Sequence, residues 1–208
     1  MSLNRKDHWD NVYAQKGPMD VSWYQRSPTI SLQLIASTGI DHPSKVIDIG
    51  GGASVLVDKL LEAGYTDVTV LDISVNSIHY AKERLKGQAE QVTWIVSDIT
   101  EFAPVCAYDV WHDRAVFHFL TDPKDRQSYV EVMKKAVNPG GHVIISAFAL
   151  QGPPKCSGLN VERYSMEKMA GELGKDFKFV KSVDEIHLTP GKKEQKFIYG
   201  YFKKYKSE

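Results

Sequence analysis

A short apolar run that stops in three consecutive glycines constrains the fold of this chain more than any other stretch. Residues 46–49 suit a strand that is buried on both faces, as in a parallel sheet, and glycines 50–52 follow at once. Apolar residues at helical spacing then continue over 55–64. Because glycine permits positive φ and close approach of the backbone to a ligand, this stretch predicts a tight strand-to-helix turn that cradles a ligand.

Strand-like and helix-like patterns alternate on both sides of this turn. Ser27-Pro28, Ser74, Asp122-Pro123 and Ser165 each predict the start of a helix, because a polar N-cap or a proline in the first turn precedes apolar residues at helical spacing. Further strands are expected at 68–72, 92–96, 108–112 and 142–147. Repeated strand-then-helix order requires right-handed crossovers and a parallel sheet.

The last part of the chain has a different pattern. Two strand-like runs at 177–188 and 195–203 are joined by a short turn, which requires an antiparallel hairpin. The expected fold is therefore α/β, a three-layer, doubly wound, seven-stranded sheet that is mostly parallel with the last strand antiparallel. A chain of 208 residues suits one domain over 1–208, with an N-terminal lid at 1–27, a cofactor-binding core at 28–150 and an acceptor-side loop, helix and hairpin at 151–208.

The bulk composition excludes several classes of protein. Lys and Arg together number 26 and Asp and Glu number 26, so the balanced charge indicates no nucleic-acid partner. No apolar run is long enough to span a membrane, so no membrane partner is expected. Only two cysteines occur and there is no signal peptide, which indicates a soluble protein of a reducing compartment, most simply the cytoplasm.

Aspartates stand at the ends of three expected strands, at Asp48, Asp72 and Asp98. Ligands of open parallel sheets bind outside the carboxyl ends of the strands, and Asp72 has the spacing at which a carboxylate meets ribose hydroxyls. The Asp48 carboxylate would repel a pyrophosphate, and Val55 occupies the position of the third glycine of the dinucleotide fingerprint. An adenosine ligand with positive charge near the glycines is favoured, and S-adenosylmethionine, with its sulfonium and ammonium, meets that description.

Several motifs in order along residues 28–150 carry a family resemblance. They are Asp48-x-Gly50-x-Gly52, Asp72 at the end of the second strand, Ser97-Asp98-Ile99 after the third, and Asn138-Pro139-Gly140-Gly141 before the fifth. Together they resemble the class I, Rossmann-like S-adenosylmethionine-dependent methyltransferases. The seven-stranded order with a final antiparallel hairpin is also what this family implies.

The resemblance implies roles for individual residues. Asp48 and the backbone of Gly50 and Gly52 would hold the methionine portion of the cofactor. Asp72 would bind the ribose, with Ile73 beside it in the same site, and Asp98 with the Ile99 backbone would bind the adenine. The family's third glycine is Ser54 here, which is expected to cap the following helix instead.

The N-terminal segment is rich in aromatic residues. Trp9-x-x-x-Tyr13 and Ser22-Trp23-Tyr24-Gln25 resemble a segment that closes over the cofactor in thiopurine-type and some protein-lysine methyltransferases, which implies that Tyr24 and Gln25 bind the cofactor. Aromatic rings over a sulfonium would gain about 0.5–2 kcal/mol from cation–π attraction. The alternative is that the rings pack the first helix against the sheet.

The end of the fourth strand supplies the candidate catalytic residues His112, Asp113 and His118. The Trp111-x-Asp113-Arg114 core resembles the thiopurine-type enzymes, without their following glycine. Each of the three also has a structural interpretation. Both histidines can be satisfied within the fold, and Asp113 can form an ion pair with Arg114 that holds the loop.

Two further segments belong on this side by topology. Cys156, in the long connection after the fifth strand, and His187, at the end of the sixth, are expected to wall the acceptor pocket. Cys156 suits either a soft contact to the acceptor or a small apolar filler. No cysteine or histidine has a local metal-ligand spacing, so no metal is expected.

The sequence therefore predicts an S-adenosylmethionine-dependent methyltransferase that acts by in-line displacement on a small-molecule acceptor and releases S-adenosylhomocysteine. The alternatives are a protein-lysine methyltransferase and a non-catalytic S-adenosylmethionine-binding sensor or partner domain. A closed aromatic pocket would favour small acceptors, and an open acidic groove would favour protein substrates.

Overall fold

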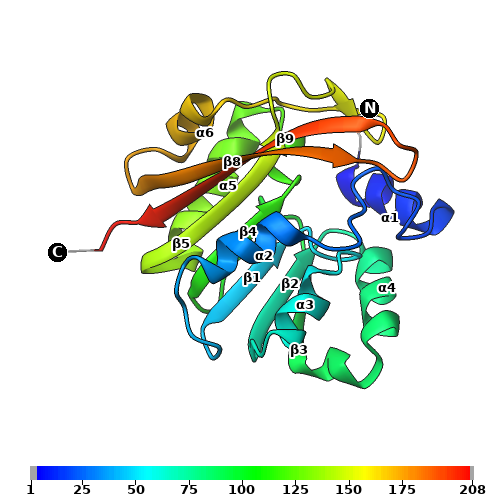
Figure 1. The fold of residues 1–208 in the computed structure, drawn as a ribbon, viewed down its shortest axis with the longest axis horizontal. Coiled ribbons are helices and arrows are strands. Elements are labelled where there is room, and N and C mark those ends of the chain that lie inside the picture. Colours follow the sequence, from blue (N-terminus) through cyan, green and yellow to red (C-terminus); the bar gives the residue numbers. More distant parts are fainter. Residues whose placement is uncertain (1–3, 207–208) are drawn as a thin grey trace.

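The computed structural model of the chain describes residues 4–206 and has three layers, with helices on both faces of a central sheet (Figure 1). The first three residues of the expected lid and the last two of the expected domain lie outside the described residues. Within the described range, no helix combines the length and apolar character needed to cross a membrane.

The central sheet has seven strands in the order β3-β2-β1-β4-β5-β9-β8. Neighbouring strands from β3 to β5 pair in parallel, whereas β9 is antiparallel to both β5 and β8. The prediction of a mostly parallel sheet with its last strand antiparallel is therefore confirmed. The strands are β1 (Lys45–Ile49), β2 (Asp67–Asp72), β3 (Val92–Val96), β4 (Tyr108–Arg114), β5 (Val137–Phe148), β8 (Phe177–Leu188) and β9 (Glu194–Lys204).

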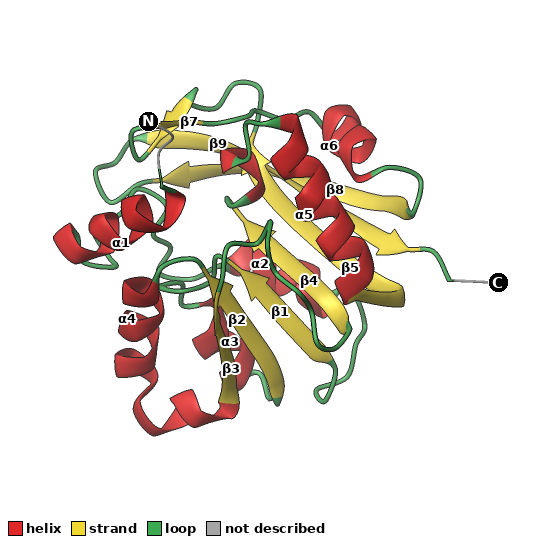
Figure 2. Cartoon of the chain, turned by 180° about the vertical axis from the view of Figure 1, so that it is seen from behind, coloured by secondary structure: helices red, strands yellow, loops and turns green. Residues whose placement is uncertain are grey.

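Helices cover both faces of the sheet (Figures 1 and 2). Helices α2 (Thr29–Ala36) and α3 (Leu56–Glu62) bury Leu34 and Leu60 in the core cluster of one face. Helices α5 (Pro123–Ala136) and α6 (Met166–Leu173) bury Met133 and Met169 in the cluster of the other. The remaining helical segments are α4 (Val75–Leu85), η1 (Lys86–Gln91), η2 (Phe117–Phe119) and the N-terminal α1 (Arg5–Gln15).

Most predicted helix starts are confirmed by side-chain caps. Ser74, Asp122 and Ser165 each accept a hydrogen bond from a backbone N–H in the first turn of α4, α5 and α6. The predicted N-cap at Ser27 is wrong by one residue. Pro28 holds the N-cap position of α2 at φ −80° and ψ 61°, and no side chain caps the helix.

Three elements differ from the sequence-based expectation. The sequence pattern did not predict helix α1, because this helix has almost no apolar periodicity. Its N-cap, Asn4, accepts hydrogen bonds from two N–H groups of the first turn. Strand β5 begins at Val137, so the glycine-containing turn is part of the strand rather than a connection before it. The connection after β5 contains a small hairpin of β6 (Lys155–Cys156) and β7 (Leu159–Asn160).

A buried hydrogen-bond chain ties β4 to α5 beneath the site. The Tyr129 hydroxyl donates to Asp113 Oδ2 at 2.7 Å and accepts from Trp111 Nε1 at 2.8 Å. Asp113 also accepts from the backbone N–H groups of Val116 and Phe117. Burial nevertheless raises the pKa of Asp113 to about 6, against the lowering effect of the Tyr129 hydrogen bond.

We expect Tyr129→Phe to lower the free energy of unfolding by about 1–3 kcal/mol, because it removes one donor from a fully buried carboxylate. Urea denaturation measures this loss. Tyr205→Phe, at a tyrosine that is 56% exposed, is the matched control and should change stability by less than about 0.5 kcal/mol. Equal effects of the two substitutions would contradict a structural role for the Tyr129 hydroxyl.

Candidate cofactor and acceptor site

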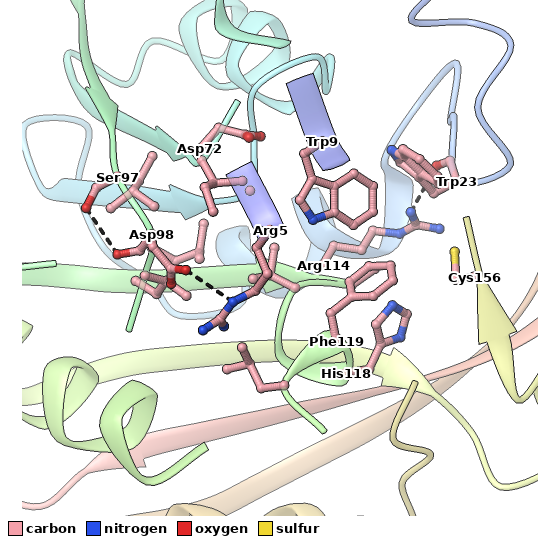
Figure 3. A pocket seen from close by; sticks show the side chains of 18 of the residues that line it. Arg5, Trp9, Trp23, Asp72, Ser97, Asp98, Arg114, His118, Phe119 and Cys156 are labelled. Atoms are coloured by element: carbon pink, nitrogen blue, oxygen red, sulfur yellow. Dashed lines mark hydrogen bonds and ion pairs between the residues drawn. The ribbon is translucent and has the colours of Figure 1, made fainter. Parts of the chain in front are cut away.

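Two adjoining cavities lie at the carboxyl ends of the parallel strands. The first extends from Asp72 and Asp98 to His118 and Cys156, and Figure 3 shows Trp9 between these two ends. The second is lined by Asp48, His112 and the glycine turn. Both are lined by Tyr13, Trp23, Ile49, Gly50 and Arg114, so the point where they meet lies beside the glycine turn.

The glycine turn has no room for side chains. Gly50 has a φ of +67°, which favours glycine. A Cβ at Gly51 would lie 2.3 Å from Asp48 Oδ2, and one at Gly52 would lie 2.6 Å from Asp72 Oδ2 and 2.0 Å from the Ser77 hydroxyl. The glycines therefore let the backbone pack directly against two carboxylates. Ser54, at the third glycine position, accepts the backbone N–H of Leu56 at the start of α3.

Asp48 presents a free carboxylate oxygen in the second cavity. Its Oδ1 is 2.7 Å from His112 Nδ1, and His112 Nε2 is 2.9 Å from the Ser31 hydroxyl. Asp48 Oδ2 is buried and has no hydrogen-bond partner among residues 4–206. A buried carboxylate oxygen needs a donor or a cation, so this atom fits the ammonium group of S-adenosylmethionine. Both ring nitrogens of His112 are therefore occupied, by Asp48 and by Ser31, which agrees with the structural interpretation of this histidine.

Asp72 lies where the ribose of an adenosine ligand is expected. Its Oδ2 accepts the backbone N–H of Gly52 at 3.0 Å and its Oδ1 accepts that of Ser74 at 2.8 Å. Burial raises the pKa of Asp72 to about 6 although both hydrogen bonds favour the carboxylate. Each oxygen has a further lone pair for a ribose hydroxyl. Ile73 lines the same end of the first cavity.

Asp98 is already engaged at the expected adenine position. Its Oδ1 accepts from the backbone N–H and the hydroxyl of Thr100, and its Oδ2 is 3.3 Å from Nε of Arg5. Arg5 also pairs with Asp125 at 3.3 Å, so α1 reaches over this end of the cavity. Ile99 is buried in the cavity wall. No sequence pattern pointed to Arg5, because its partners lie far along the chain.

The aromatic rings of the N-terminal segment pack together at the cavity. The Trp9 ring lies 5.6 Å from that of Trp23 and 4.8 Å from that of Phe119, between centroids, and Trp23 Nε1 donates to the Tyr13 hydroxyl. Trp9, Tyr13 and Trp23 also line the first cavity. The same rings can therefore pack against one another and contact a ligand in that cavity. Tyr24 lines the second cavity.

Arg114 joins the lid to the C-terminal hairpin. It donates to the Tyr199 hydroxyl and to the backbone carbonyl of Trp23, and it pairs with Glu185 at 3.3 Å. Gln25 lines the second cavity, and its side-chain amide donates to Glu185 at 2.7 Å. The expected Asp113–Arg114 ion pair is wrong. Successive residues of a strand point to opposite faces, and the two side chains have separate partners.

Asp113 is not brought together with the other candidate catalytic residues. It lines neither cavity, and its oxygens are occupied by Tyr129 and by two backbone N–H groups. We therefore assign it no chemical step. His187 also has a partner within the fold, because its Nε2 lies 2.8 Å from the backbone carbonyl of Ser22 in the N-terminal segment. No group of three or more His, Cys, Asp or Glu side chains in the described part of the chain is placed to hold a metal.

His118 and Cys156 lie at the far end of the first cavity (Figure 3). His118 is fully buried, and its Nδ1 accepts the backbone N–H of Phe148 at 3.3 Å. Burial, helped by the Arg114 charge, lowers the pKa of His118 to about 3. Burial raises the pKa of the Cys156 thiol to about 11, so both groups are neutral near pH 7.

Ala115 adopts a conformation that favours glycine. It follows Arg114 in the wall of the first cavity and has a φ of +73°. The local resemblance to thiopurine-type enzymes implies a glycine at this position, where this chain has alanine. The left-handed region costs a non-glycine residue roughly 1–2 kcal/mol.

Comparisons with known proteins agree with this fold. Residues 47–143 match the family model for the methyltransferase domain. The solved N-methyltransferase NodS from Bradyrhizobium japonicum, in complex with S-adenosylhomocysteine, superimposes with a TM-score of 0.73 over 95% of this chain and 99% of its own, at 19% identity. Residues 47–143 are therefore similar to a methyltransferase domain, and the chain shares its fold with a solved N-methyltransferase.

Curated relatives match part of this chain, and their names give different acceptors. The malonyl-[acyl-carrier protein] O-methyltransferase of Anoxybacillus flavithermus is 34% identical over 52% of this chain and 40% of its own. The bovine eEF1A lysine and N-terminal methyltransferase is 27% identical over 58% of this chain and only 17% of its own. The zebrafish EEF1A lysine methyltransferase 2 is 23% identical over 70% of this chain and 69% of its own. The match therefore spans a minor part of the first two relatives.

We expect Ala115→Gly to raise the free energy of unfolding by about 0.5–1 kcal/mol, because relief of the positive φ exceeds the greater freedom of glycine in the unfolded chain. Urea denaturation measures the gain. Ala14→Gly, at an exposed position of α1, should instead lower stability by about 0.5–1 kcal/mol. Destabilisation by both substitutions would contradict strain at Ala115.

The lowered pKa of His118 predicts a pH-dependent stability. Its folded-state pKa lies below the unfolded value of 6.5, so its contribution is fully present above about pH 6.5 and is lost as pH falls towards about 3. The contribution should change by about 1.4 kcal/mol per pH unit in that range. The raised pKa values of Asp72 and Asp113 act in the opposite direction up to about pH 6, but they are common to wild type and variant.

Urea denaturation of wild type and His118→Gln from about pH 4 to about pH 7 isolates this effect. The difference in unfolding free energy between the two should move in favour of the variant as pH falls. His79→Gln, at an exposed position of α4, is the control. A difference that is independent of pH would show that His118 is not held neutral.

Proposed function

We propose that the protein transfers a methyl group from S-adenosylmethionine to a nucleophilic acceptor. The observation that carries this proposal is a buried oxygen of Asp48 that has no hydrogen-bond partner within residues 4–206 and lies beside the glycine turn, whose Gly52 N–H bonds to Asp72. A carboxylate at this position fits a cationic methionine portion and disfavours a pyrophosphate. Asp72 and Asp98 then stand where ribose and adenine would lie, as the family resemblance implies.

The cofactor, when bound, supplies an electrophilic methyl group on a sulfonium, and attack by the acceptor's lone pair leaves S-adenosylhomocysteine. The chain's own contribution is alignment and exclusion of water, which can together lower a barrier by about 7–11 kcal/mol. Trp9, Tyr13 and Trp23 cover the cavity, and their rings suit contact with a sulfonium. Arg114 and Glu185 hold this lid against β4 and the C-terminal hairpin.

The acceptor is a small molecule in this proposal. The acceptor end of the first cavity is walled mainly by apolar and aromatic side chains, including Phe119, Leu120 and Phe197. An aromatic wall of this kind suits a compact apolar acceptor. Cys106 and Cys156 are free thiols, which fits a reducing compartment, and we extend the proposal to a cytoplasmic location.

A protein-lysine acceptor is the second candidate, favoured by the similarity to the eEF1A lysine methyltransferases. A cofactor-binding sensor without catalysis is the third. Methyl transfer from labelled cofactor to a panel of small acceptors and lysine peptides separates the three. Turnover of lysine peptides alone favours the second candidate, and cofactor binding with no turnover favours the third.

Calorimetry tests the cofactor assignment directly. S-adenosylmethionine and S-adenosylhomocysteine should bind, whereas NAD should not, because the Asp48 carboxylate disfavours a pyrophosphate. Tighter binding of NAD would overturn the assignment.

Asp72→Ala should weaken binding of S-adenosylhomocysteine by about 1.5–3 kcal/mol through loss of charged hydrogen bonds to the ribose. The same calorimetric titration measures the loss. Asp184→Ala, at an exposed aspartate of β8, is the matched control and should leave affinity unchanged. Unchanged affinity in Asp72→Ala would show that the adenosine lies elsewhere.

A further inference from the structure

The acceptor end of the first cavity contains a buried nitrogen whose partner is missing. His118 is 0% exposed, and its Nε2 has no hydrogen-bond partner among the residues that the structure describes. Its Nδ1 accepts the N–H of Phe148, so a neutral ring must carry its proton on Nε2. The tautomer is assigned from this hydrogen bond. The wall of the first cavity therefore contains an N–H donor that has no hydrogen-bond acceptor among the described residues.

The surroundings of His118 oppose a second proton. Its ring contacts those of Phe119 and Phe148, with centroids 4.5 and 4.7 Å apart, and lies near that of Phe197. The Arg114 guanidinium lies 4.6 Å from the centroid of Phe197, on the same wall. The other titratable groups near this end include the Cys156 thiol of β6, the Tyr13 and Tyr199 hydroxyls, and two residues of β8. These two are Glu185, which is paired with Arg114, and His187, whose ring centroid lies 6.0 Å from that of Phe197. Apolar burial and a nearby cation both favour the neutral ring.

Neither His118 nor Cys156 can remove a proton from an acceptor at this end of the cavity. Nδ1 of His118 is occupied by the Phe148 N–H, and Nε2 already carries a proton. Burial raises the pKa of Cys156, so its thiol stays protonated near pH 7. The carboxylates of Asp72 and Asp98 line the opposite end of the cavity. A protonated amine would find no base here and would face the Arg114 cation.

We propose that the acceptor is a small apolar molecule that carries an oxyanion, either a carboxylate or the anion of an acidic hydroxyl, and that His118 Nε2–H holds this oxyanion. The assignment rests on the proposed methyl transfer. Arg114 adds favourable potential, and the rings of Phe119 and Phe197 contact the apolar body. An oxygen lone pair forms the new bond to the methyl carbon while the carbon–sulfur electron pair stays on sulfur, so no proton has to move.

The protonation state of His118 is measurable in the free protein. Long-range ¹H–¹⁵N spectra of the histidine rings, assigned with His118→Gln, should show a neutral ring with protonated Nε2 and unprotonated Nδ1 from about pH 5 to about pH 8. A ring that titrates with a midpoint between about 6 and 7, or one that carries its proton on Nδ1, overturns the proposal.

Binding of a matched naphthalene series tests the oxyanion. Calorimetry with 2-naphthoate, 2-naphthol and 2-naphthylmethylamine in the presence of S-adenosylhomocysteine should give tightest binding for 2-naphthoate. His118→Leu, which removes the donor, should weaken binding of 2-naphthoate by about tenfold or more, and His118→Gln, which keeps an N–H, by less. His79→Gln is the control. Binding of the amine as tight as that of 2-naphthoate, or equal binding by wild type and His118→Leu, overturns the proposal.

The two levels of the assignment fail in different ways. If S-adenosylhomocysteine does not bind the wild-type protein, the proposed methyl transfer fails. If it binds but His118 titrates near neutral pH, or lysine peptides are methylated in preference to oxyanions, only the oxyanion assignment fails.

Discussion

Direct packing of a side-chain-free turn against two buried carboxylates underlies the arrangement of the site. Any Cβ at Gly51 or Gly52 would collide with Asp48 or Asp72, so the glycines set the distance between the backbone and the two strand ends. The Gly52 N–H in turn holds Asp72, and Asp48 is held by His112 from the neighbouring strand. Because the same contacts define the turn and the ligand groove, changes to either affect both.

Hydrogen bonds and ion pairs hold the N-terminal segment in place at both ends of the first cavity. Arg114 reaches the lid backbone, the last strand and the edge strand at once, and Gln25 meets the same Glu185 carboxylate. At the other end α1 is held by Arg5 and by Asp10, which accepts the Ser74 hydroxyl at 2.7 Å. The N-terminal segment therefore spans the first cavity from Asp98 to Arg114, and its rings line the cavity between them.

Burial decides the chemistry available at the acceptor end. A histidine at the surface would take up protons near neutral pH, but His118 is enclosed by aromatic rings and lies near Arg114, so it stays neutral. The same enclosure keeps Cys156 protonated. In the proposed site, hydrogen-bond donors beside a neutral His118 and a neutral Cys156 suit an acceptor that arrives deprotonated.

The sequence alone determined a mostly parallel seven-stranded sheet with its last strand antiparallel and most helix starts, and it placed three aspartates at strand ends, because these depend on local patterns and on strand-end positions that topology brings to one edge. Asp48, Asp72 and Asp98 needed only the alternation of strands and helices to be placed together. Tertiary structure decided which groups are paired and which are free. Arg114 and Glu185 are 71 positions apart, Gln25 and Glu185 are 160 apart, and Phe148 lies 30 positions from His118. No periodicity encodes such partners, and only their packing shows that Asp113 is occupied while Asp48 Oδ2 and His118 Nε2 have no partner among the described residues.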